Sequence, residues 1–446
     1  MSNRSDRVRK IGVPPIQKIA VKGYKSIRSE QAIEIRPLTL LAGANSSGKS
    51  SIMQSVLLLK QTLESTYDPG PLLLDGPNAK FSKASQLFFK GKGSSEKQFQ
   101  ITLDLDDISY TMHFSKGERS GLHLTRMDWN TKELSFKLTP QTTPDEILQI
   151  LSSINLQGLI KLPAAFITQA LTASHPSVAR NRCFFEIRGL GLPAIMRNND
   201  VIEAIRSIIH VPGLRGNPTR NYPVSAVGVT FPGTFENYTA SILAKWQDEK
   251  SPRQKPLDII GQYLKELGLT WKIRAHKVDD TKVELQVGRT LKSTQGGAGD
   301  MVNVADVGFG VSQTLPVLVA LVAARPGQVV YLEQPEIHLH PRAQVAMAKI
   351  LADAASRGVR VIAETHSSLL LTGVQTLVAS GELSPDLVKL HWFTRDDGGE
   401  TQITSANLDE TGAFGDWPED FDEVVLQAEG NYMDSVDVRI EQEKLF

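Results

Sequence analysis

The octapeptide GANSSGKS, Gly43 to Ser50, constrains this chain more than any other stretch of its sequence. An apolar run, LTLLA, precedes the octapeptide, and the segment after it carries apolar residues at helical spacing, including Ile52, Val56 and Leu59. Small residues between a strand and a helix let successive backbone N–H groups face one anion, and the helix N-terminus adds its positive dipole end. The pattern G-x-x-x-x-G-K-[ST] in this setting predicts a loop that cradles the phosphates of a nucleotide.

Two side chains of this loop have expected roles in such a site. Lys49 would reach the β- and γ-phosphates, and Ser50 would offer its hydroxyl to a magnesium ion. The cofactors that the loop predicts are therefore ATP and Mg²⁺. The other residues of this segment that we expect to contact the nucleotide are Asn45, Ser46, Ser47, Gly48 and Ser51.

Composition limits the class of protein. A chain of 446 residues is longer than one typical core and predicts two or three lobes. Its net charge of zero gives no global basic field toward nucleic acid, which leaves only a local patch open. The single cysteine, Cys183, excludes an internal disulfide framework. The N-terminus resembles no secretory signal, and the longest apolar run, Leu315 to Ala324, is too short to span a bilayer. We therefore expect a cytoplasmic protein without a membrane partner.

Patterns along the chain predict an α/β fold with a mostly parallel sheet. Residues 97–138 read as strands of an antiparallel lobe, and 143–210 read as mainly helical. From Val304 onward helices and strands alternate, which places helices on the faces of a parallel sheet. The four units that we expect are an N-terminal lobe with the phosphate loop over 1–138, a mainly helical insertion over 139–225, a C-terminal lobe over 226–415 and an acidic tail over 416–446.

The stretch VVYLEQPEIHLHP, Val329 to Pro341, is an apolar strand that ends in polar residues. Glu333 can hold magnesium directly or through water, because carboxylate oxygens suit that hard ion. Gln334 follows where an ATPase would place its general base, and an amide orients water but takes no proton from it. A positioned base is worth about 10²–10⁴ in rate, so we expect slow hydrolysis with nucleotide binding kept. Glu336 and Glu364 stay open as alternative bases.

Three residues of the same stretch raise a second interpretation. Glu336, His338 and His340 alternate along an extended segment, and histidine is a common metal ligand, so an independent metal site stays open. Farther along the chain, His366 ends the strand VRVIAETH. Parallel sheets bind ligands at the carboxyl ends of their strands, so His366 is a candidate functional residue.

The order of these motifs resembles the ABC-type ATPase fold of the RecF, SMC and OLD (overcoming lysogenization defect) proteins. The order is phosphate loop, long insertion, GFGVSQTLP, VVYLE strand and ETHSS. The opening VKGYKSI is similar to the FKSF-type strand of SMC heads, which adds Lys25 and Ser26 as nucleotide-binding candidates. GFGVSQTLPVL, EQPEIHLHPRAQ and ETHSSLLL are most similar to a bacterial subgroup that includes the ATPase subunits of Septu-type anti-phage systems.

This resemblance implies roles for further residues. The active unit in the family is a head-to-tail pair, in which the signature helix of one subunit contacts the γ-phosphate bound by the other. The resemblance makes His366 the switch histidine, Gln334 the residue at the catalytic position and Gln86 the glutamine that senses magnesium. The signature segment GVSQ would consist of Gly310, Val311, Ser312 and Gln313.

The leading functional hypothesis is an ATPase subunit that ATP closes into a dimer and that then holds or releases an effector, a nuclease. The chain itself has no apparent nuclease domain after His366. A RecF- or SMC-like clamp in DNA repair and a non-hydrolysing ATP-bound scaffold stay open as alternatives. Arg215 and Arg220 lie in a Gly/Pro-rich loop, which is either a contact for nucleic acid, nucleotide or partner, or a solvated loop.

Overall fold

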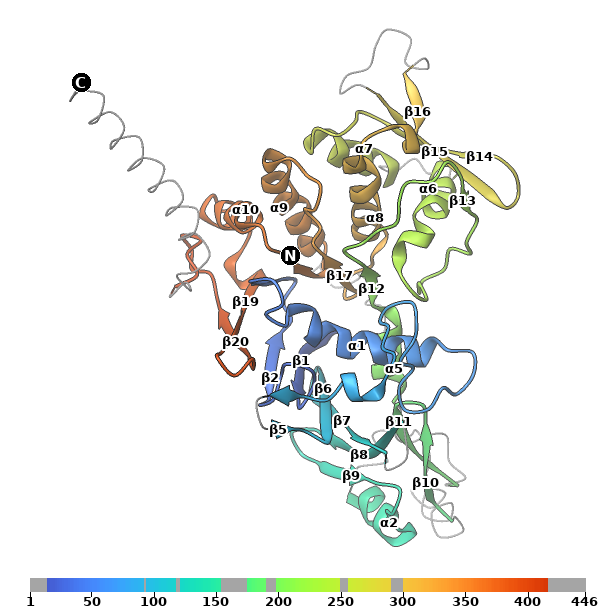
Figure 1. The fold of residues 1–446 in the computed structure, drawn as a ribbon, viewed down its shortest axis with the longest axis vertical. Helices are drawn as coiled ribbons and strands as arrows, with labels where there is room; N and C mark the ends of the chain where they lie inside the picture. The colour runs from blue at the N-terminus through green and yellow to red at the C-terminus, as the bar shows by residue number, and fades with distance from the viewer. Residues whose placement is uncertain are drawn as a thin grey trace, which may run out of the picture.

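The computed structural model describes residues 14–91, 94–117, 121–153, 175–189, 198–248, 256–289 and 300–415. The predicted acidic tail, residues 1–13 and parts of the predicted helical insertion lie outside the described residues. The described residues form two large sheets with helices around them (Figure 1). None of their helices is long and apolar enough to cross a lipid bilayer.

The first large sheet has the strand order β12-β17-β18-β3-β19-β20. Neighbouring strands from β12 to β19 run parallel, and only β20 pairs antiparallel with β19. The mostly parallel sheet that the alternating pattern predicted is therefore confirmed. Its strands are β3 (Leu38–Gly43), β12 (Ile209–Val211), β17 (Val329–Glu333), β18 (Arg360–Glu364), β19 (Val388–Arg395) and β20 (Thr401–Ala406).

The second large sheet is antiparallel throughout, in the order β2-β1-β6-β7-β8-β9. Its strands alternate buried and exposed residues, as expected where one face of a sheet packs on a core. The β-rich character predicted for 97–138 is confirmed. The strands are β1 (Ile16–Lys22), β2 (Gln31–Glu34), β6 (Gln98–Leu105), β7 (Ile108–Lys116), β8 (Leu122–Asn130) and β9 (Ser135–Leu138).

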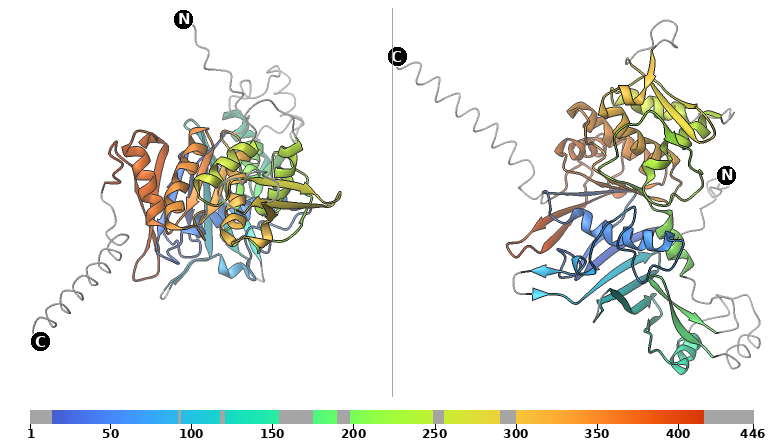
Figure 2. Two further views of the ribbon diagram at one scale, coloured as in Figure 1. Left: turned by 90° about the horizontal axis from the view of Figure 1, so that it is seen from above. Right: turned by 45° about the vertical axis from the view of Figure 1, so that its right-hand side comes forward.

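Helix α1 (Lys49–Glu64) lies between the two large sheets (Figures 1 and 2). Leu41 of β3 faces the core that α1 shares with the antiparallel sheet. Leu38, Leu40 and Ala42 face the opposite core. That opposite core is closed by helices α8 (Phe309–Ala323), α9 (Pro341–Ser356) and α10 (Ser368–Ala379). The phosphate loop thus begins on a strand that is buried on both faces.

The segment that the sequence predicted to be mainly helical also contains a hairpin. Strands β10 (Ser177–Asn181) and β11 (Phe184–Arg188) pair antiparallel there, between helices α2 (Pro144–Ser153) and α5 (Asn199–Ser207). The Phe-Phe-x-Ile run of β11 buries its aromatic residues in the core of the antiparallel lobe, which favours a strand over a helix.

A smaller sheet and two helices complete the C-terminal lobe. Strands β13, β14 and β16 all pair antiparallel with β15. The remaining strands and helices are β4 (Lys90–Gly91), β5 (Ser94–Ser95), β13 (Tyr222–Pro223), β14 (Ile273–Lys277), β15 (Lys282–Gly288), β16 (Met301–Asn303), α6 (Thr239–Asp248) and α7 (Pro256–Glu266). Short 3-10 turns cover Ala84–Gln86, Phe235–Tyr238, Val304–Asp306 and Pro385–Leu387.

Candidate functional site

The loop between β3 and α1 takes a path that only glycine permits at two positions. Gly43 and Gly48 have φ angles of 141° and 106°. A Cβ atom on Gly43 would lie 2.2 Å from the carbonyl oxygen of Phe393, and one on Gly48 would lie 2.4 Å from Oγ1 of Thr401. Strands β19 and β20 therefore press against the loop and fix the tight curl that a phosphate cradle needs.

Lys49 begins α1 and lies inside this loop, with 3% of its surface exposed. Its Nζ atom donates to the carbonyl oxygens of Gly43 (2.9 Å) and Ala44 (2.7 Å). Burial lowers the pKa of Lys49 to about 8, against the opposing effect of the Glu364 charge. A buried ammonium group gains most from a negatively charged partner, and a nucleotide phosphate is such a partner.

Ser50, the next residue, contacts a carboxylate that the sequence did not single out for this position. Its hydroxyl donates to Oε1 of Glu364 at 2.8 Å, and the hydroxyl of Tyr331 donates to Oε2 at 2.8 Å. Strand β18 lies between β17 and β3, so Glu364 stands directly beside the phosphate loop. Burial raises the pKa of the Glu364 carboxyl group, and the two hydrogen bonds oppose that rise.

Glu333, the predicted magnesium residue, points to a different group of partners. Its Oε1 atom lies 3.2 Å from Nε2 of His210, and its Oε2 atom accepts from the backbone N–H of Gly213 at 2.9 Å. Burial alone would raise the pKa of Glu333, but the contact with His210 lowers it below the usual value. The carboxylate oxygens of Glu333 therefore contact β12 and the residue Gly213 beyond it, and the structure pairs neither of them with Ser50.

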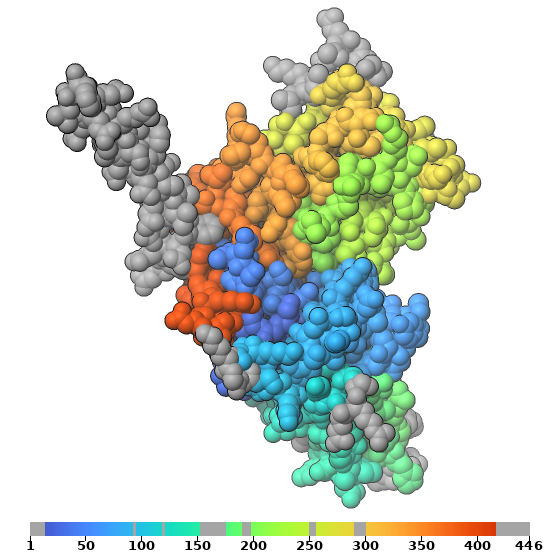
Figure 3. Space-filling model, viewed as in Figure 1, coloured from blue at the N-terminus to red at the C-terminus, as the bar shows by residue number. Residues whose placement is uncertain are grey.

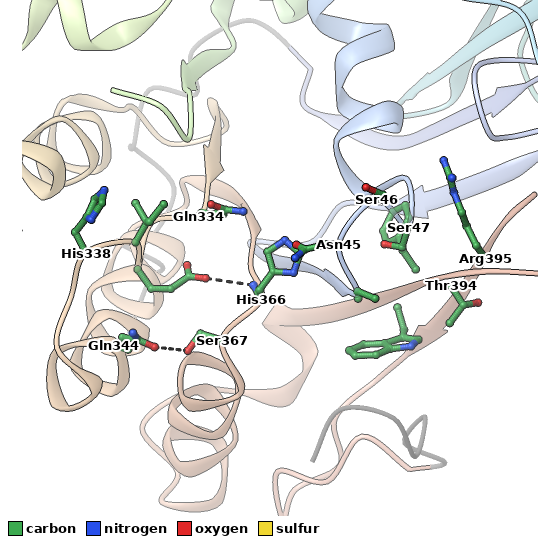
Figure 4. A pocket seen from close by; sticks show the side chains of 16 residues that line it. Asn45, Ser46, Ser47, Gln334, His338, Gln344, His366, Ser367, Thr394 and Arg395 are labelled. Atoms are coloured by element: carbon green, nitrogen blue, oxygen red, sulfur yellow. Dashed lines mark hydrogen bonds between the residues drawn. The ribbon is translucent and has the colours of Figure 1, made fainter. Parts of the chain in front are cut away.

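Gln334 and His366 lie at the mouth of the phosphate loop. Figure 4 shows their side chains converging with that of Asn45. Gln334 has a φ angle of 47°, and its backbone N–H donates to the carbonyl oxygen of Glu364 at 2.8 Å. Burial and the nearby charge of Lys49 lower the pKa of His366, so its imidazole is neutral at neutral pH. Both residues line the cavities beside the phosphate loop, and their roles at a γ-phosphate stay predictions.

Glu336 is buried beneath His366. Its Oε1 atom accepts from Oγ1 of Thr365 (2.6 Å) and from the backbone N–H of His366 (3.2 Å). Its Oε2 atom is buried and has no hydrogen-bond partner among the described residues. Burial raises the pKa of Glu336, which makes its carboxylate a stronger proton acceptor than an ordinary glutamate. Glu336 therefore positions His366 and keeps one oxygen for a further group.

The metal interpretation of Glu336, His338 and His340 does not fit the geometry. His340 is the N-cap of α9 and accepts from the backbone N–H of Arg342 at 3.4 Å. The ring of His338 lies 5.9 Å from that of Phe309. Among the described residues, no three His, Cys, Asp or Glu side chains come together as a metal-binding group.

The opposite wall of the site is basic. Lys25 has a φ angle of 52° and donates to Oε1 of Gln54 at 2.7 Å. Burial and the charge of Arg395 lower the pKa of Lys25. Ser26 accepts at its hydroxyl from Thr401 at 2.8 Å, which ties the opening segment to β20. Sequence reasoning missed Arg395; the only signal was a cation at the carboxyl end of a strand, and β19 was not known to neighbour β3.

Gln86 also reaches this wall, but its amide oxygen is engaged. Oε1 of Gln86 accepts from the backbone N–H groups of Ser82 (3.0 Å) and Lys83 (3.1 Å). A contact of this oxygen with magnesium would require those bonds to open. The role predicted for Gln86 stays a prediction.

Two adjoining cavities surround the phosphate loop, and Asn45, Ser46, Gln334, His366 and Arg395 line both. The cavity on the α1 side has a volume of about 800 Å³, within the range of roughly 300–1,000 Å³ typical of ligand sites. In the space-filling view, the blue residues of this region reach the surface between the orange and cyan parts of the chain (Figure 3). The predicted residues that also line the α1-side cavity are Lys25, Ser26, Gly48, Lys49, Ser50, Ser51 and Gln86, and those on the other side are Ser47 and Glu336.

The predicted signature segment lines neither cavity. Ser312 donates to the carbonyl oxygen of Phe309 at 3.1 Å, and Val311 is buried in the core. Gly310 has no contact with the phosphate loop of its own chain, and Phe309 beside it is 50% exposed. The N-cap of α8, Gly308, makes no side-chain hydrogen bond, so no side chain of the cap residue satisfies the N–H groups of this helix end.

Arg215 is buried, with 4% of its surface exposed, and this corrects the expectation of a solvated or partner-binding side chain. Its guanidinium donates to the carbonyl oxygens of Gln313 (3.0 Å), Glu333 (2.7 Å) and Gln334 (3.1 Å). The amide of Gln313 donates back to the carbonyl oxygen of Arg215 at 2.7 Å. Arg220 is exposed and pairs with Asp306 at 2.6 Å, as a residue of a surface loop does. A Gly/Pro-rich composition did not reveal that this loop returns into the protein.

The donor set fits a magnesium nucleotide. Lys49 and the curled loop backbone suit phosphate oxygens, and the Ser50 hydroxyl with one carboxylate suits a hard cation. Mg²⁺ is commonly held by one or two protein ligands together with phosphates and water, so a closed protein cage is not required.

Two family models match this chain. The model described as "AAA ATPase domain" matches residues 15–172, which include the phosphate loop. The model described as "AAA domain, putative AbiEii toxin, Type IV TA system" matches residues 224–372, which include the predicted signature segment, Glu333, Gln334 and His366. Each match spans less than half of the chain. The chain therefore carries AAA-type ATPase domain sequence in two segments. Neither of these matches supports the resemblance to Septu-type systems.

Solved head domains of SMC proteins are similar to this chain in structure. An SMC head bound to the C-winged helix domain of ScpA is 12% identical, with a TM-score of 0.45 over 89% of this chain and 99% of that one. A head domain from Pyrococcus furiosus, bound to the C-terminal domain of ScpA, is 12% identical, with a TM-score of 0.44 over 88% and 96%. The head domain from Thermotoga maritima is 10% identical, with a TM-score of 0.37 over 87% and 98%. Identities and scores this low transfer no activity or partner, and no curated protein matches the chain.

Proposed function

We propose that this chain is a cytoplasmic, ABC-type ATPase that binds ATP with magnesium, hydrolyses it slowly, and pairs head to tail with a second copy. The observation that carries the proposal is the convergence of Lys49, Ser50, Gln334 and His366 on one cavity. Gln334 and His366 follow the neighbouring parallel strands β17 and β18, and Lys49 and Ser50 begin the helix after β3. The carboxyl ends of such strands are where open α/β sheets bind ligands.

Binding begins with an exchange of partners at Lys49. Its Nζ atom gives up carbonyl oxygens of the loop for β- and γ-phosphate oxygens, and the loop itself keeps its shape because glycine and the strands beside it fix the curl. A magnesium ion bound at Ser50 would neutralise developing phosphate charge. His366, neutral and held by Glu336 through its backbone N–H, offers an imidazole at the γ-phosphate end.

Slow hydrolysis follows from the residue at the catalytic position. The amide of Gln334 can hold a water molecule but cannot remove its proton. Glu336 is the described carboxylate with a raised pKa and an oxygen without a partner on this side of the loop. Its raised pKa supports Glu336 as a less well placed base, which fits a low rate rather than none.

Head-to-tail pairing is supported by the absence of the predicted signature segment from the two cavities beside its own phosphate loop. Gly310 and its neighbours at the N-terminus of α8 line neither cavity beside the phosphate loop of the same chain, and a helix N-terminus is a good partner for a phosphate. The half-exposed Phe309 beside it would be covered in a pair.

The pair is proposed to gate a partner effector, a nuclease, in bacterial anti-phage defence of the Septu type. This part rests on the resemblance of the EQPEIHLHP and ETHSS segments. The alternatives are a RecF- or SMC-like DNA repair clamp and an ATP-bound scaffold that does not hydrolyse. Gln334 is the observation that favours the scaffold.

The proposal is tested by sedimentation and single-turnover hydrolysis on the same preparation. We expect ATP with magnesium to shift the chain from monomer to dimer, and we expect bound ATP to be hydrolysed slowly. Failure to bind ATP would refute the proposal at its first step. Binding and pairing with no hydrolysis over a full day would favour the scaffold, and copurification of a nuclease rather than repair proteins would favour the defence role.

A further inference from the structure

We propose that Glu364 of β18, and not Glu333 of β17, is the carboxylate that holds the magnesium ion of a bound nucleotide at Ser50. The inference rests on the proposed nucleotide binding and assigns the metal to a strand that the sequence motifs did not indicate. Its basis is the set of contacts that each of the two carboxylates makes.

The first contact is direct. Oε1 of Glu364 lies 2.8 Å from Oγ of Ser50, the hydroxyl that the phosphate loop offers to magnesium. A cation placed at Ser50 is therefore within reach of this carboxylate, either as a ligand or through one bound water. No other carboxylate of the described residues hydrogen-bonds to Ser50.

The second contact fixes the orientation of Glu364. Tyr331 is fully buried and donates its hydroxyl to Oε2 at 2.8 Å. Tyr331 belongs to β17 and Glu364 to β18, two strands in parallel register. Groups that hydrogen-bond to a metal ligand from behind set its geometry, and their loss commonly costs about 10–100-fold in metal affinity. The carboxylate is thus held in place before any cation arrives.

The third observation is that both carboxylate oxygens of Glu333 already have partners other than Ser50. Its two oxygens are paired with His210 (3.2 Å) and the N–H of Gly213 (2.9 Å), on the side of β17 that borders β12. The imidazole of His210 is 2% exposed and also contacts Asn78 at 3.0 Å, so it is fixed on both nitrogens. Turning Glu333 toward Ser50 would break both contacts and leave buried polar groups unpaired.

Strand order explains why two neighbouring glutamates differ in this way. Glu333 and Glu364 are paired in register, but β18 is the strand next to β3 and β17 is one strand farther away. The side chain of Glu364 needs only to reach the start of α1 from the adjacent strand. Glu333 instead has β12 on its other side, and its partners are His210 of that strand and Gly213 just after it.

The test measures a metal rather than turnover. Mn²⁺ replaces Mg²⁺ as a spectroscopic probe, and its binding to the full chain saturated with a non-hydrolysable ATP analogue is followed by electron paramagnetic resonance. We expect Glu364→Gln, which removes the charge of the ligand itself, to weaken Mn²⁺ binding by more than the about 10–100-fold that loss of a supporting group costs. The matched variant Glu333→Gln is expected to change it less than about threefold. Tyr331→Phe, which removes only the supporting hydroxyl, should fall between these values.

Nucleotide binding in EDTA and thermal unfolding are measured on the same three variants. Glutamine still accepts a hydrogen bond from Ser50, so Glu364→Gln should unfold near the wild-type temperature. The inference is overturned if Glu333→Gln weakens Mn²⁺ binding as much as Glu364→Gln does, or if Glu364→Gln has no effect. If the wild-type chain binds no nucleotide even with metal, the proposed function itself fails, which separates that outcome from failure of this inference.

Discussion

The phosphate loop and the predicted signature segment are built in opposite ways. The loop is surrounded by its own chain, with Lys49 3% exposed and Ser50 paired to a buried carboxylate. The signature segment begins at an uncapped helix end beside the half-exposed Phe309 and lines neither cavity. One region has every partner it needs for binding, and the other has a free surface. This contrast fits the proposal that nucleotide binding needs one chain, whereas completion of the site needs a second copy.

The largest effect is expected for a change in the phosphate loop that removes nucleotide binding. Lys49→Ala removes the buried cation and should weaken ATP binding by at least about 100-fold, because charge-assisted hydrogen bonds are worth about 1.5–3 kcal/mol each and two phosphates lose theirs. Calorimetric titration measures it. Lys277→Ala, which changes an exposed lysine paired with Asp248, is the control and should bind as the wild type does. Unchanged affinity of Lys49→Ala would remove this lysine from its assigned role.

The next largest effect is expected for a change in the predicted signature segment. Gly310→Arg should leave ATP binding intact and weaken ATP-dependent pairing by at least about 30-fold, since a bulky cation would occupy the space of the partner site. Sedimentation with and without ATP measures the pairing. Gly310→Ala is the matched control, because a Cβ there meets the end of the Leu269 side chain at 3.1 Å and the carbonyl oxygen of His338 at an ordinary 3.8 Å. If the arginine variant pairs as well as the alanine variant, the head-to-tail geometry is wrong.

A third change tests the role of Gln334 in hydrolysis of the bound nucleotide. Gln334→Glu should raise single-turnover hydrolysis about tenfold, toward the 10²–10⁴ that a well-placed base contributes. Saturating ATP avoids confusion with slow dimer opening or weaker binding. Glu336→Gln in the same assay tells which carboxylate acts in the wild type. Fast wild-type hydrolysis that Glu336→Gln or Glu364→Gln abolishes would show that Gln334 does not limit the rate.

The smallest effect concerns pH. Burial lowers the pKa of Lys49 to about 8, and only the protonated form attracts phosphate. Affinity is therefore full below pH 7 and falls as the pH rises through 8, because a shrinking fraction of the free protein is competent to bind. Between pH 7 and 8.5 the loss should be about fourfold by calorimetry. Lys49→Arg stays charged over this range, so the same loss in that variant would place the titrating group elsewhere.

The phosphate loop could be predicted from the sequence because its information is local. A strand, eight residues and a helix carry the whole geometry, and the structure places Asn45, Ser46 and Lys49 in the cavity as expected. Gln334 and His366 were also found, because each ends a strand whose apolar pattern is plain. The mainly parallel sheet followed from the alternation of helices and strands.

The partners of the two glutamates could not be predicted in the same way. Which of Glu333 and Glu364 reaches Ser50 depends on strand order, and β18 enters the sheet between two strands that come earlier in the chain. The burial of Arg215 was hidden for a similar reason, since its three acceptors are carbonyl groups of α8 and of the end of β17. Every residue has a backbone carbonyl group, so the sequence does not identify the carbonyl groups that accept hydrogen bonds from Arg215. Arg395 was missed because nothing local reveals that β19 borders the phosphate strand.

The buried Arg215 gives the chain a rigid internal linkage. One guanidinium holds the backbone of the signature helix at Gln313 and the backbone of the catalytic turn at Gln334, with oxygen contacts of 3.0 and 3.1 Å. The turn itself is strained, because Gln334 has a φ angle of 47°. A displacement of α8 would therefore act on the turn at Gln334 through the hydrogen bonds of Arg215. In the proposed pair, a partner that displaces α8 would displace Gln334 as well, so a lone subunit and a paired one would differ at the side-chain amide of this residue.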